Sequence, residues 1–242
     1  MLAIIPARSG SKGVPEKNIK LIGGIPLFAY SIIIAKMTPS VDRIIVSTDS
    51  EDYAKIARKF GAETPFLRPA EISGDKSTDF ELFSHSLNWF KQNENYTPEH
   101  ILHLRPTTPL REPFVMENAI KLFLKNNEKA SSLRSGHLAP ESPFKWFLRD
   151  TNNYYIGLKE GLTPEKINKP RQSFPSVYVP NGYIDILKSS TILKTDTLHG
   201  DNMLVFESPF CVEIDTIDDF KYLEYQIENQ ESSILNYYKK TK

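Results

Sequence analysis

The chain has 242 residues, 40% of them hydrophobic and 25% charged, which is ordinary for a globular protein. Its 30 basic residues balance its 30 acidic ones, so no overall field favours nucleic acid or an acidic membrane surface. A single cysteine excludes an intrachain disulfide and a cysteine-rich metal site, and we expect a cytoplasmic chain because no signal peptide or bilayer-length apolar run is apparent.

The chain opens with a short apolar strand, residues 2–6, that leads into a loop rich in glycine and serine, residues 7–18. A turn at the carboxyl end of a buried strand exposes backbone N–H groups, which bind anions well. The loop also contains three cations, Arg8, Lys12 and Lys17. These features predict a polyphosphate site, and a solvated basic loop is the alternative.

Helices and strands then alternate along the chain. Hydrophobic spacing predicts helices over 27–37, 51–60, 77–92 and 113–126, and strands over 43–49, 100–104 and 129–133. Either Asp49 or Ser50 is expected to cap the second helix. The alternation predicts an α/β fold with a doubly wound, mostly parallel, Rossmann-like sheet. Ligands bind such sheets at the carboxyl ends of the strands, where residues 7–18, 47–50 and 105–111 fall.

Residues from about 136 to 180 differ from the rest, because they are rich in proline and aromatic residues and show little periodicity. Exposed aromatics at this density would promote aggregation unless they were covered. We therefore expect a single domain over 1–242 with a small insertion, approximately 136–180, that leaves the main body as an arm and pairs with a second subunit. The core resumes at 181–186, and a final helix follows Asp215.

Five segments in order resemble the CMP-sialic acid synthetase (acylneuraminate cytidylyltransferase) family. They are IIPARSGSKG (4–13) with KN (17–18), IVSTD (45–49), LRPAE (67–71), RPTTPLR (105–111), and PRQ (170–172) with PNG (180–182). The likeness covers roughly residues 1–230. It implies a nucleotidyltransferase fold and an enzyme that joins CTP to a nonulosonic acid, a nine-carbon 2-keto sugar acid, with release of pyrophosphate. It also implies Mg²⁺, with Mn²⁺ as a possible substitute, and a homodimer.

The chemistry of this family explains why such residue types are needed. The anomeric hydroxyl of the sugar attacks the α-phosphorus of CTP in line, so the protein must mainly position the substrates and neutralise charge. By resemblance, the catalytic residues are Arg8, Lys12, Lys17 and Asp215. Those implied to bind the nucleotide are Ala7, Arg8, Ser11, Lys12, Asn18, Arg68, Ser77 and Thr78.

Two carboxylates near the end of the core are expected to hold the metal. Glu213 and Asp215 alternate along a predicted strand, so both side chains should point to one face, and Mg²⁺ commonly takes one or two carboxylates. The family usually has aspartate at both positions, so Glu213 is a departure, and Asp215 has helix capping as its alternative role. All five histidines are interpreted as structural, which leaves metal-bound solvent or a carboxylate near Asp215 as the general base.

The expected sugar pocket departs from the sialic acid pattern. The residues implied to bind the sugar are Lys17, Arg105, Lys145, Arg171, Asn181 and Asp185, of which Lys145 matches a lysine that reaches across from a partner subunit. Arg105 stands where glutamine is common, and Asp185 where tyrosine is common, so different hydroxyl or amide groups should be recognised. The pattern resembles the CMP-N,N′-diacetyllegionaminic acid synthase type, which favours that acid over sialic acid. A KDO cytidylyltransferase and a non-catalytic CTP- or sugar-nucleotide-binding sensor are the alternatives.

Overall fold

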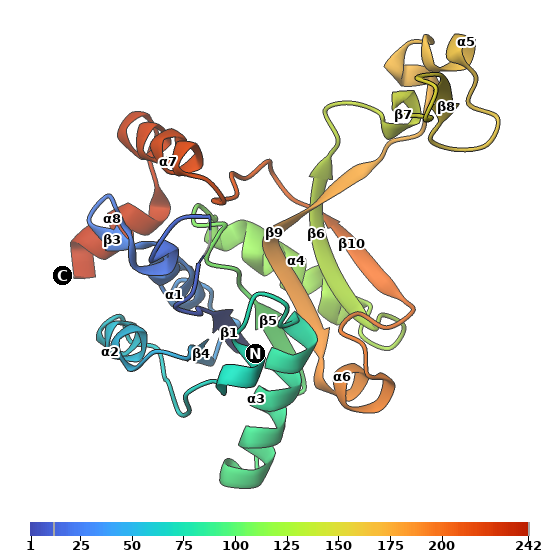
Figure 1. Ribbon diagram of the computed structural model, residues 1–242. Helices are drawn as coiled ribbons and strands as arrows, with labels where there is room; N and C mark the ends of the chain where they lie inside the picture. Colours follow the sequence, from blue (N-terminus) through green and yellow to red (C-terminus); the bar gives the residue numbers. More distant parts are fainter. Residues whose placement is uncertain (12, 242) are drawn as a thin grey trace.

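The structure, a computed structural model, describes residues 1–11 and 13–241 (Figure 1). Its strands are β1 (Leu2–Pro6), β2 (Leu21–Ile22), β3 (Ile25–Pro26), β4 (Arg43–Ser47), β5 (His100–His103), β6 (Ser132–Leu138), β7 (Phe147–Arg149), β8 (Tyr155–Gly157), β9 (Tyr178–Lys188) and β10 (Met203–Glu207). Its α-helices are α1 (Leu27–Lys36), α2 (Glu51–Lys59), α3 (Asp79–Glu94), α4 (Pro113–Lys125), α5 (Pro164–Ile167), α6 (Ser189–Thr195), α7 (Ile217–Asn229) and α8 (Ser233–Thr241). No helix in the described part of the chain is both long and apolar enough to span a membrane.

A six-stranded sheet forms the centre of the molecule, with the strand order β10-β6-β9-β5-β1-β4. Strands β4 and β5 both run parallel to β1, and β10 runs parallel to β6. Strand β9 is antiparallel to both of its neighbours. The prediction of a mostly parallel α/β sheet is confirmed, and the carboxyl ends of β1, β4 and β5 meet at one edge.

Helices cover both faces of the sheet, and the alternation of side chains along β1 shows how. Ala3 and Ile5 belong to a buried cluster that includes the apolar faces of α1 and α4. Leu2 and Ile4 belong to a second cluster, packed against α3 and α6. Because successive side chains on a strand point to opposite faces, one short strand contributes to both cores.

Most predicted elements are present, with boundaries shifted by a few residues. Ser50 caps α2, since its side chain accepts a hydrogen bond from the backbone N–H of Tyr53. The strand expected over 129–133 begins instead at Ser132 and continues to Leu138. The strand expected at Glu213–Asp215 is wrong, because residues 208–216 form a loop without strand pairing.

The segment after β6 leaves the body of the molecule. Strand β6 and the beginning of β9 pair beyond the sheet and lead to a small lobe, residues 139–177, which contains β7, β8 and α5 (Figure 1). Large apolar side chains of this lobe are exposed, namely Trp146, Phe147, Leu148, Tyr154 and Ile156. Pairing of this arm with a second subunit stays a prediction.

Candidate active site

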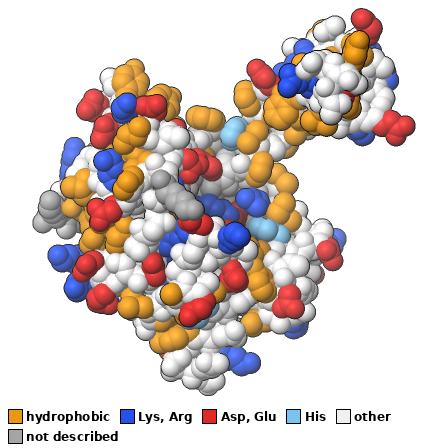
Figure 2. Space-filling model, in the orientation of Figure 1, with side chains coloured by type: hydrophobic (Ala, Val, Ile, Leu, Met, Phe, Trp, Pro, Cys, Tyr) orange, Lys and Arg blue, Asp and Glu red, His pale blue; other side chains and the backbone are white. Residues whose placement is uncertain are grey.

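A cavity of about 590 Å³ lies where the three parallel strand ends meet. Its walls come from the loop after β1, from the loop after β5 and from the residues that lead into α3. Lys and Arg side chains gather in the hollow at the centre of this face (Figure 2). An anionic ligand would therefore meet positive charge at the carboxyl edge of the sheet, as predicted for folds of this class.

Hydrogen bonds with Asp49, in the segment that follows β4, and with Asn18, in the loop itself, hold the loop after β1 in place. The carboxylate of Asp49, which follows β4, accepts hydrogen bonds from the backbone N–H and from the hydroxyl of Ser9, both at 2.8 Å. The side-chain amide of Asn18, which is buried, donates to the carbonyl oxygen of Arg8 at 2.9 Å. Asp49 therefore supports the loop, and of the two capping candidates Asp49 and Ser50 it is Ser50 that caps the helix.

Gly13 shows how closely this loop approaches the end of the core. A Cβ atom at this position would lie 2.6 Å from the carbonyl oxygen of Asp215, closer than real Cβ atoms come to such a neighbour. The loop can make this approach only because it has glycine here. Gly10, in the same loop, has open space at its Cβ position.

Many of the predicted ligand-binding residues lie around this cavity. Those that line it are Arg8, Ser11, Lys17, Asn18, Arg68, Ser77, Thr78, Arg105 and Asp215. Ala7 is fully buried behind it, and its backbone N–H donates to the carbonyl oxygen of Ser47. Lys12 lies outside the described residues. The contacts of all these residues with ligands stay predictions.

Lys17 and Asp215 approach each other at the rim of the cavity. The Nζ atom of Lys17 lies 3.1 Å from Oδ1 of Asp215 and donates to the carbonyl oxygen of Ile214 at 2.8 Å. The Asp215 side chain is 73% exposed, whereas that of Lys17 is 14% exposed. Asp215 therefore presents its carboxylate to the opening of the cavity.

The second carboxylate expected at the metal site lies elsewhere. Glu213 accepts a hydrogen bond from the backbone N–H of Gly182 and lines a separate cavity beside Cys211 and Tyr222. The expectation that Glu213 and Asp215 share a face is wrong, because no strand forms there. No cluster of three metal-ligating side chains occurs among residues 1–11 and 13–241. The single carboxylate of Asp215 would be compatible with a Mg²⁺ ion whose other ligands were phosphate oxygens and water.

Arg68 is held against the end of β4. Its Nε donates to the hydroxyl of Ser47 at 3.2 Å, and its Nη2 donates to the Ser47 carbonyl oxygen. The side chain is buried, and this burial lowers the pKa of Arg68 to about 10, so the guanidinium remains charged near neutral pH. Its position in the cavity wall is compatible with the predicted contact with the nucleotide.

Arg105 lies between two carboxylates. Its Nη1 donates to Oδ2 of Asp185 at 2.6 Å, and its Nη2 donates to Oδ2 of Asp79 at 3.2 Å. The Asp185 side chain is only 1% exposed and does not line the cavity, although a sugar contact is predicted for it. In this arrangement Asp185 positions Arg105, and Arg105 lines the cavity.

Two buried residues behind Arg105, His103 and Arg111, were not recognised from the sequence as residues that support the site. His103, the last residue of β5, has ring atom Nδ1 3.7 Å from Asp185 and 3.9 Å from Asp79, and burial lowers its pKa well below the usual range. Arg111 donates to the carbonyl oxygens of Arg105, Gly182 and Tyr183 and so fixes the loop after β5. The available signal was position, since His103 ends the strand that leads into the site and Arg111 lies in the segment that follows it.

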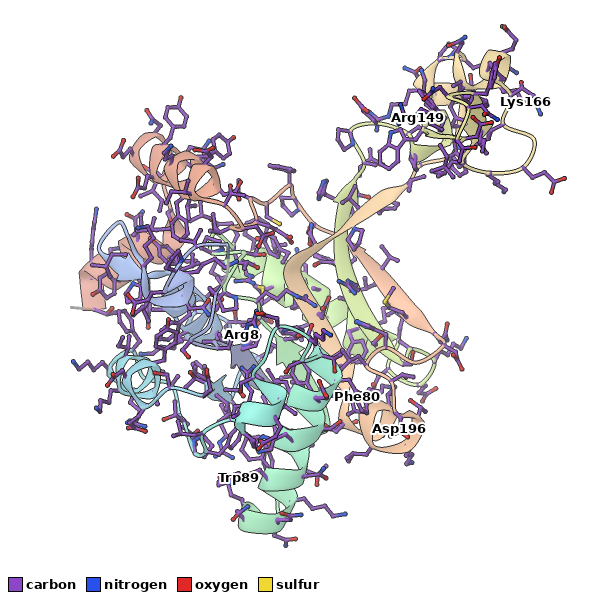
Figure 3. All side chains as sticks on the ribbon, viewed as in Figure 1. Arg8, Phe80, Trp89, Arg149, Lys166 and Asp196 are labelled. Atoms are coloured by element: carbon purple, nitrogen blue, oxygen red, sulfur yellow. The ribbon has the colours of Figure 1, made fainter. Side chains whose placement is uncertain are left out.

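The remaining predicted sugar ligands lie away from the cavity. Lys145 and Arg171 belong to the lobe, where Arg171 donates to the carbonyl oxygen of Ala139 at 2.7 Å. The lobe residues Arg149 and Lys166 are far from Arg8 in Figure 3. Asn181 is buried, and its amide bonds to the hydroxyls of Ser135 and Ser208. Within one chain Lys145 and Arg171 are therefore not brought to Arg105 (Figure 1), and Asn181 lines a separate cavity.

Comparisons with known proteins agree with this geometry. A family model described as "Cytidylyltransferase" matches residues 2–173. A Campylobacter coli relative, "Post-translational flagellin modification protein B", is 30% identical over 95% of this chain and 96% of its own. An Escherichia coli "N-acylneuraminate cytidylyltransferase" is 33% identical over 91% of this chain and 50% of its own. A Legionella pneumophila "CMP-N,N'-diacetyllegionaminic acid synthase" is 28% identical over 97% of this chain and 99% of its own.

Solved structures show the same fold. CMP:2-keto-3-deoxy-manno-octonic acid synthetase complexed with CTP superposes with a TM-score of 0.67 at 15% identity, covering 94% of this chain and 98% of its own. The 4-diphosphocytidyl-2C-methyl-D-erythritol synthase of Anaerococcus prevotii gives a TM-score of 0.61 at 12% identity, covering 94% and 97%. At these identities the likeness extends to the fold alone.

Proposed function

Since the chain belongs to the cytidylyltransferase family, we propose that it transfers CMP from CTP to the anomeric hydroxyl of a nonulosonic acid and releases pyrophosphate. The family makes the chain a nucleotidyltransferase. The observation that supports this reaction most directly is the cavity at the strand ends, where the cations Arg8, Lys17 and Arg105 lie around one space with the carboxylate of Asp215.

The reaction forms one O–P bond and breaks another. The sugar hydroxyl attacks the α-phosphorus and gives its proton to solvent or to a carboxylate near Asp215. The bond from the α-phosphorus to the oxygen that bridges to the β-phosphorus breaks, and this oxygen leaves with pyrophosphate. Arg8 and Lys12, as the resemblance implies, would offset the negative charge that develops on the leaving group, and fixed cations do this without reorganisation. The backbone of the loop after β1 is held by Asp49 and Asn18 before any ligand arrives, which favours positioning.

Mg²⁺ is the proposed cofactor, with Mn²⁺ as a substitute. Asp215 would hold it together with phosphate oxygens of CTP, and the bound ion would neutralise part of the triphosphate charge. Lys17, which already touches Asp215, would keep that carboxylate oriented. Glu213 is not included, because its carboxylate bonds to the backbone of Gly182.

The preferred sugar is proposed to be N,N′-diacetyllegionaminic acid, with sialic acid next. The names of the relatives include both acids, and sequence identities of 28% to the legionaminic acid enzyme and 33% to the sialic acid enzyme do not decide between the two acids. The support comes from Arg105 with Asp185 beneath it, which is a charged arrangement where the sialic acid pattern has neutral groups. The carboxylate common to all these acids would bind Lys17.

A homodimer would complete the site. The lobe exposes Trp146, Phe147 and Leu148, and an apolar surface of this kind is typical of an interface. Lys145, next to these residues, lies away from the cavity of its own chain, so the partner's lobe would have to bring it there. Such a dimer would act in the cytoplasm, where CTP is made, to activate sugars for surface glycans.

The deciding experiment measures pyrophosphate release with CTP and Mg²⁺ in the presence of N,N′-diacetyllegionaminic, sialic or pseudaminic acid, or KDO. We expect the rate with the legionaminic acid to be at least about tenfold higher, since a buried charged pair discriminates strongly between substituents. Preference for KDO would support the alternative cytidylyltransferase. Binding of CTP without turnover of any acid would support a non-catalytic sensor.

A further inference from the structure

Asp79 faces the cavity, although it begins a helix that does not need its side chain. Helix α3 is capped by Thr78 and Glu81: the Thr78 hydroxyl accepts from the Glu81 backbone N–H, and the Glu81 carboxylate accepts from the Thr78 backbone N–H. The carboxylate of Asp79 instead accepts from Arg105, and the side chain is 40% exposed where it lines the cavity. Helix capping therefore does not explain this carboxylate.

Arg105 is fixed on the side that faces away from the ligand. Its charge pairs with the buried carboxylate of Asp185, and its carbonyl oxygen accepts from the fully buried guanidinium of Arg111. A guanidinium has five N–H donors, and among the described residues the Arg105 side chain uses one to Asp185 and one to Asp79. A fixed donor and a half-exposed acceptor thus stand side by side at the cavity wall.

Charges of both signs surround Arg105. Asp79 and Asp185 are negative, whereas Arg134, with its Nε 3.8 Å from Asp185, and Arg111, which donates to the Arg105 carbonyl oxygen, are positive. A substrate carboxylate bound to Arg105 at the cavity wall would lie next to the carboxylate of Asp79, which repels it. A neutral hydroxyl suits the pair better, because it can donate to Asp79 and accept from Arg105 at the same time.

We propose that Asp79 is a specificity-determining residue that accepts a hydrogen bond from a substrate hydroxyl, while Arg105 donates to the same oxygen. The inference rests on the proposed function, since the ligand is a substrate of that reaction. Both substrates offer this chemistry: the sugar acid has several hydroxyls, and the ribose of CTP has two. A site built to bind a hydroxyl rejects an analogue that lacks it, because its buried polar partners are then left unpaired.

The test compares the wild type with Asp79→Ala and Asp79→Asn. One arm measures kcat/KM with CTP, 2′-deoxy-CTP and 3′-deoxy-CTP, and the other uses the preferred sugar acid and analogues that each lack one hydroxyl. We expect the wild type to disfavour one analogue by at least about tenfold, and Asp79→Ala to lose most of that discrimination through a higher KM for the parent substrate. The arm in which Asp79→Ala loses the discrimination shows whether the hydroxyl that Asp79 binds belongs to the sugar acid or to the ribose. Asp79→Asn, which keeps an acceptor oxygen, should retain part of the discrimination.

Glu81→Gln is the matched control, because it removes a carboxylate two residues away that supports the helix rather than the cavity. It should lower the melting temperature and leave the discrimination unchanged. Discrimination that survives in a folded Asp79→Ala, in both arms, overturns the role of Asp79. Parallel losses with every substrate and analogue, as expected for a purely structural residue, overturn it too. A wild type that releases no pyrophosphate with any acid contradicts the proposed function itself.

Discussion

Lys17 and Asp215 are 198 positions apart in the chain, and an ion pair of 3.1 Å joins them at the rim of the cavity. The pair connects the loop after β1, which is expected to bind phosphates, with the loop before α7, which is expected to bind the metal. The second bond of Lys17, to the carbonyl oxygen of Ile214, fixes the direction of the lysine side chain. Both ends of the proposed reaction centre therefore depend on one contact.

Replacing Asp215 by asparagine should reduce turnover by about two orders of magnitude or more, the scale of losing one key electrostatic group at a reaction centre. The amide has the same shape but no charge for a metal or for Lys17. The Mg²⁺ concentration for half-maximal activity should also rise. The measurement is steady-state pyrophosphate release at varied Mg²⁺, with thermal unfolding as the check on folding.

Lys12→Ala, predicted from the sequence alone, should show a loss of turnover of similar size. Near-normal turnover of either Asp215→Asn or Lys12→Ala would remove that residue from the mechanism.

Gly13→Ala should lower kcat/KM for CTP by at least about tenfold, because the added methyl group would push the loop away from Asp215. The Cβ atom would lie 2.6 Å from the Asp215 carbonyl oxygen, which is backbone and cannot simply rotate away. Gly10→Ala is the control in the same loop, since its Cβ has open space, and it should retain nearly full activity. Equal effects of the two substitutions would contradict the importance of the close approach.

The site was predictable as far as strand order determines it. Parallel strands place their carboxyl ends together, so Arg8 and Arg105 were expected near one another, whereas Arg68 was expected there only from the family resemblance. The structure places all three around one cavity. The prediction that Glu213 and Asp215 form a metal-binding pair was wrong for a local reason. Alternation along a strand was assumed for Glu213 and Asp215, but the segment is a loop in which the Glu213 carboxylate turns toward Gly182.

Other residues could not be recognised because their roles arise only in the tertiary structure. Asp79 follows an N-cap threonine and looks like an ordinary first-turn carboxylate, yet it meets Arg105, which is 26 positions away. His103 looks like a strand residue, and only the pairing of β5 with β9 brings its ring to Asp185. Such contacts depend on register and crossover, which a single sequence does not specify.

Asp185→Asn should destabilise the fold by about 3–5 kcal/mol, because it leaves the charge of Arg105 poorly compensated in a mostly buried site. The double variant Arg105→Gln/Asp185→Asn should recover part of this loss, since neither charge then remains. Urea denaturation of Asp185→Asn, Arg105→Gln and the double variant, compared with the wild type, measures the coupling. The control is Asp218→Asn, which breaks an exposed pair with Lys221 and should have little effect on the free energy of unfolding. An Asp185→Asn variant as stable as this control would contradict the argument.

His103 should make the protein less stable in mild acid. Burial, together with the charge of Arg105, lowers the pKa of His103 well below 6.5 in the folded state, whereas the unfolded chain takes up a proton near pH 6.5. The unfolded state therefore binds more protons below that pH. The free energy of unfolding should be constant above it and fall by up to about 1.4 kcal/mol per pH unit below it. The pKa values of His85 and His199 are also lowered in the folded state, so these two residues add to the loss of stability in acid.

Removing the titrating ring tests this assignment. His103→Gln has a neutral side chain at every pH, so the slope of unfolding free energy between pH 6.5 and 5 should be smaller by up to about one proton. Urea denaturation at three pH values in this range measures it for wild type and variant. Identical slopes would show that other groups cause the acid sensitivity, whatever the variant's stability at pH 7.5.

Two inactive variants should restore each other if the lobe of one subunit completes the cavity of its partner. Asp215→Ala disables the body of a subunit, and Lys145→Ala disables its lobe, so a heterodimer would contain one doubly defective site and one intact site. Co-expression with two different tags and tandem purification isolates it, and about half of the wild-type activity per dimer is expected from the symmetry of the assembly. The homodimers of the two variants are the controls, and both should be inactive. A heterodimer as inactive as both homodimers would mean that Lys145 acts, if at all, within its own chain.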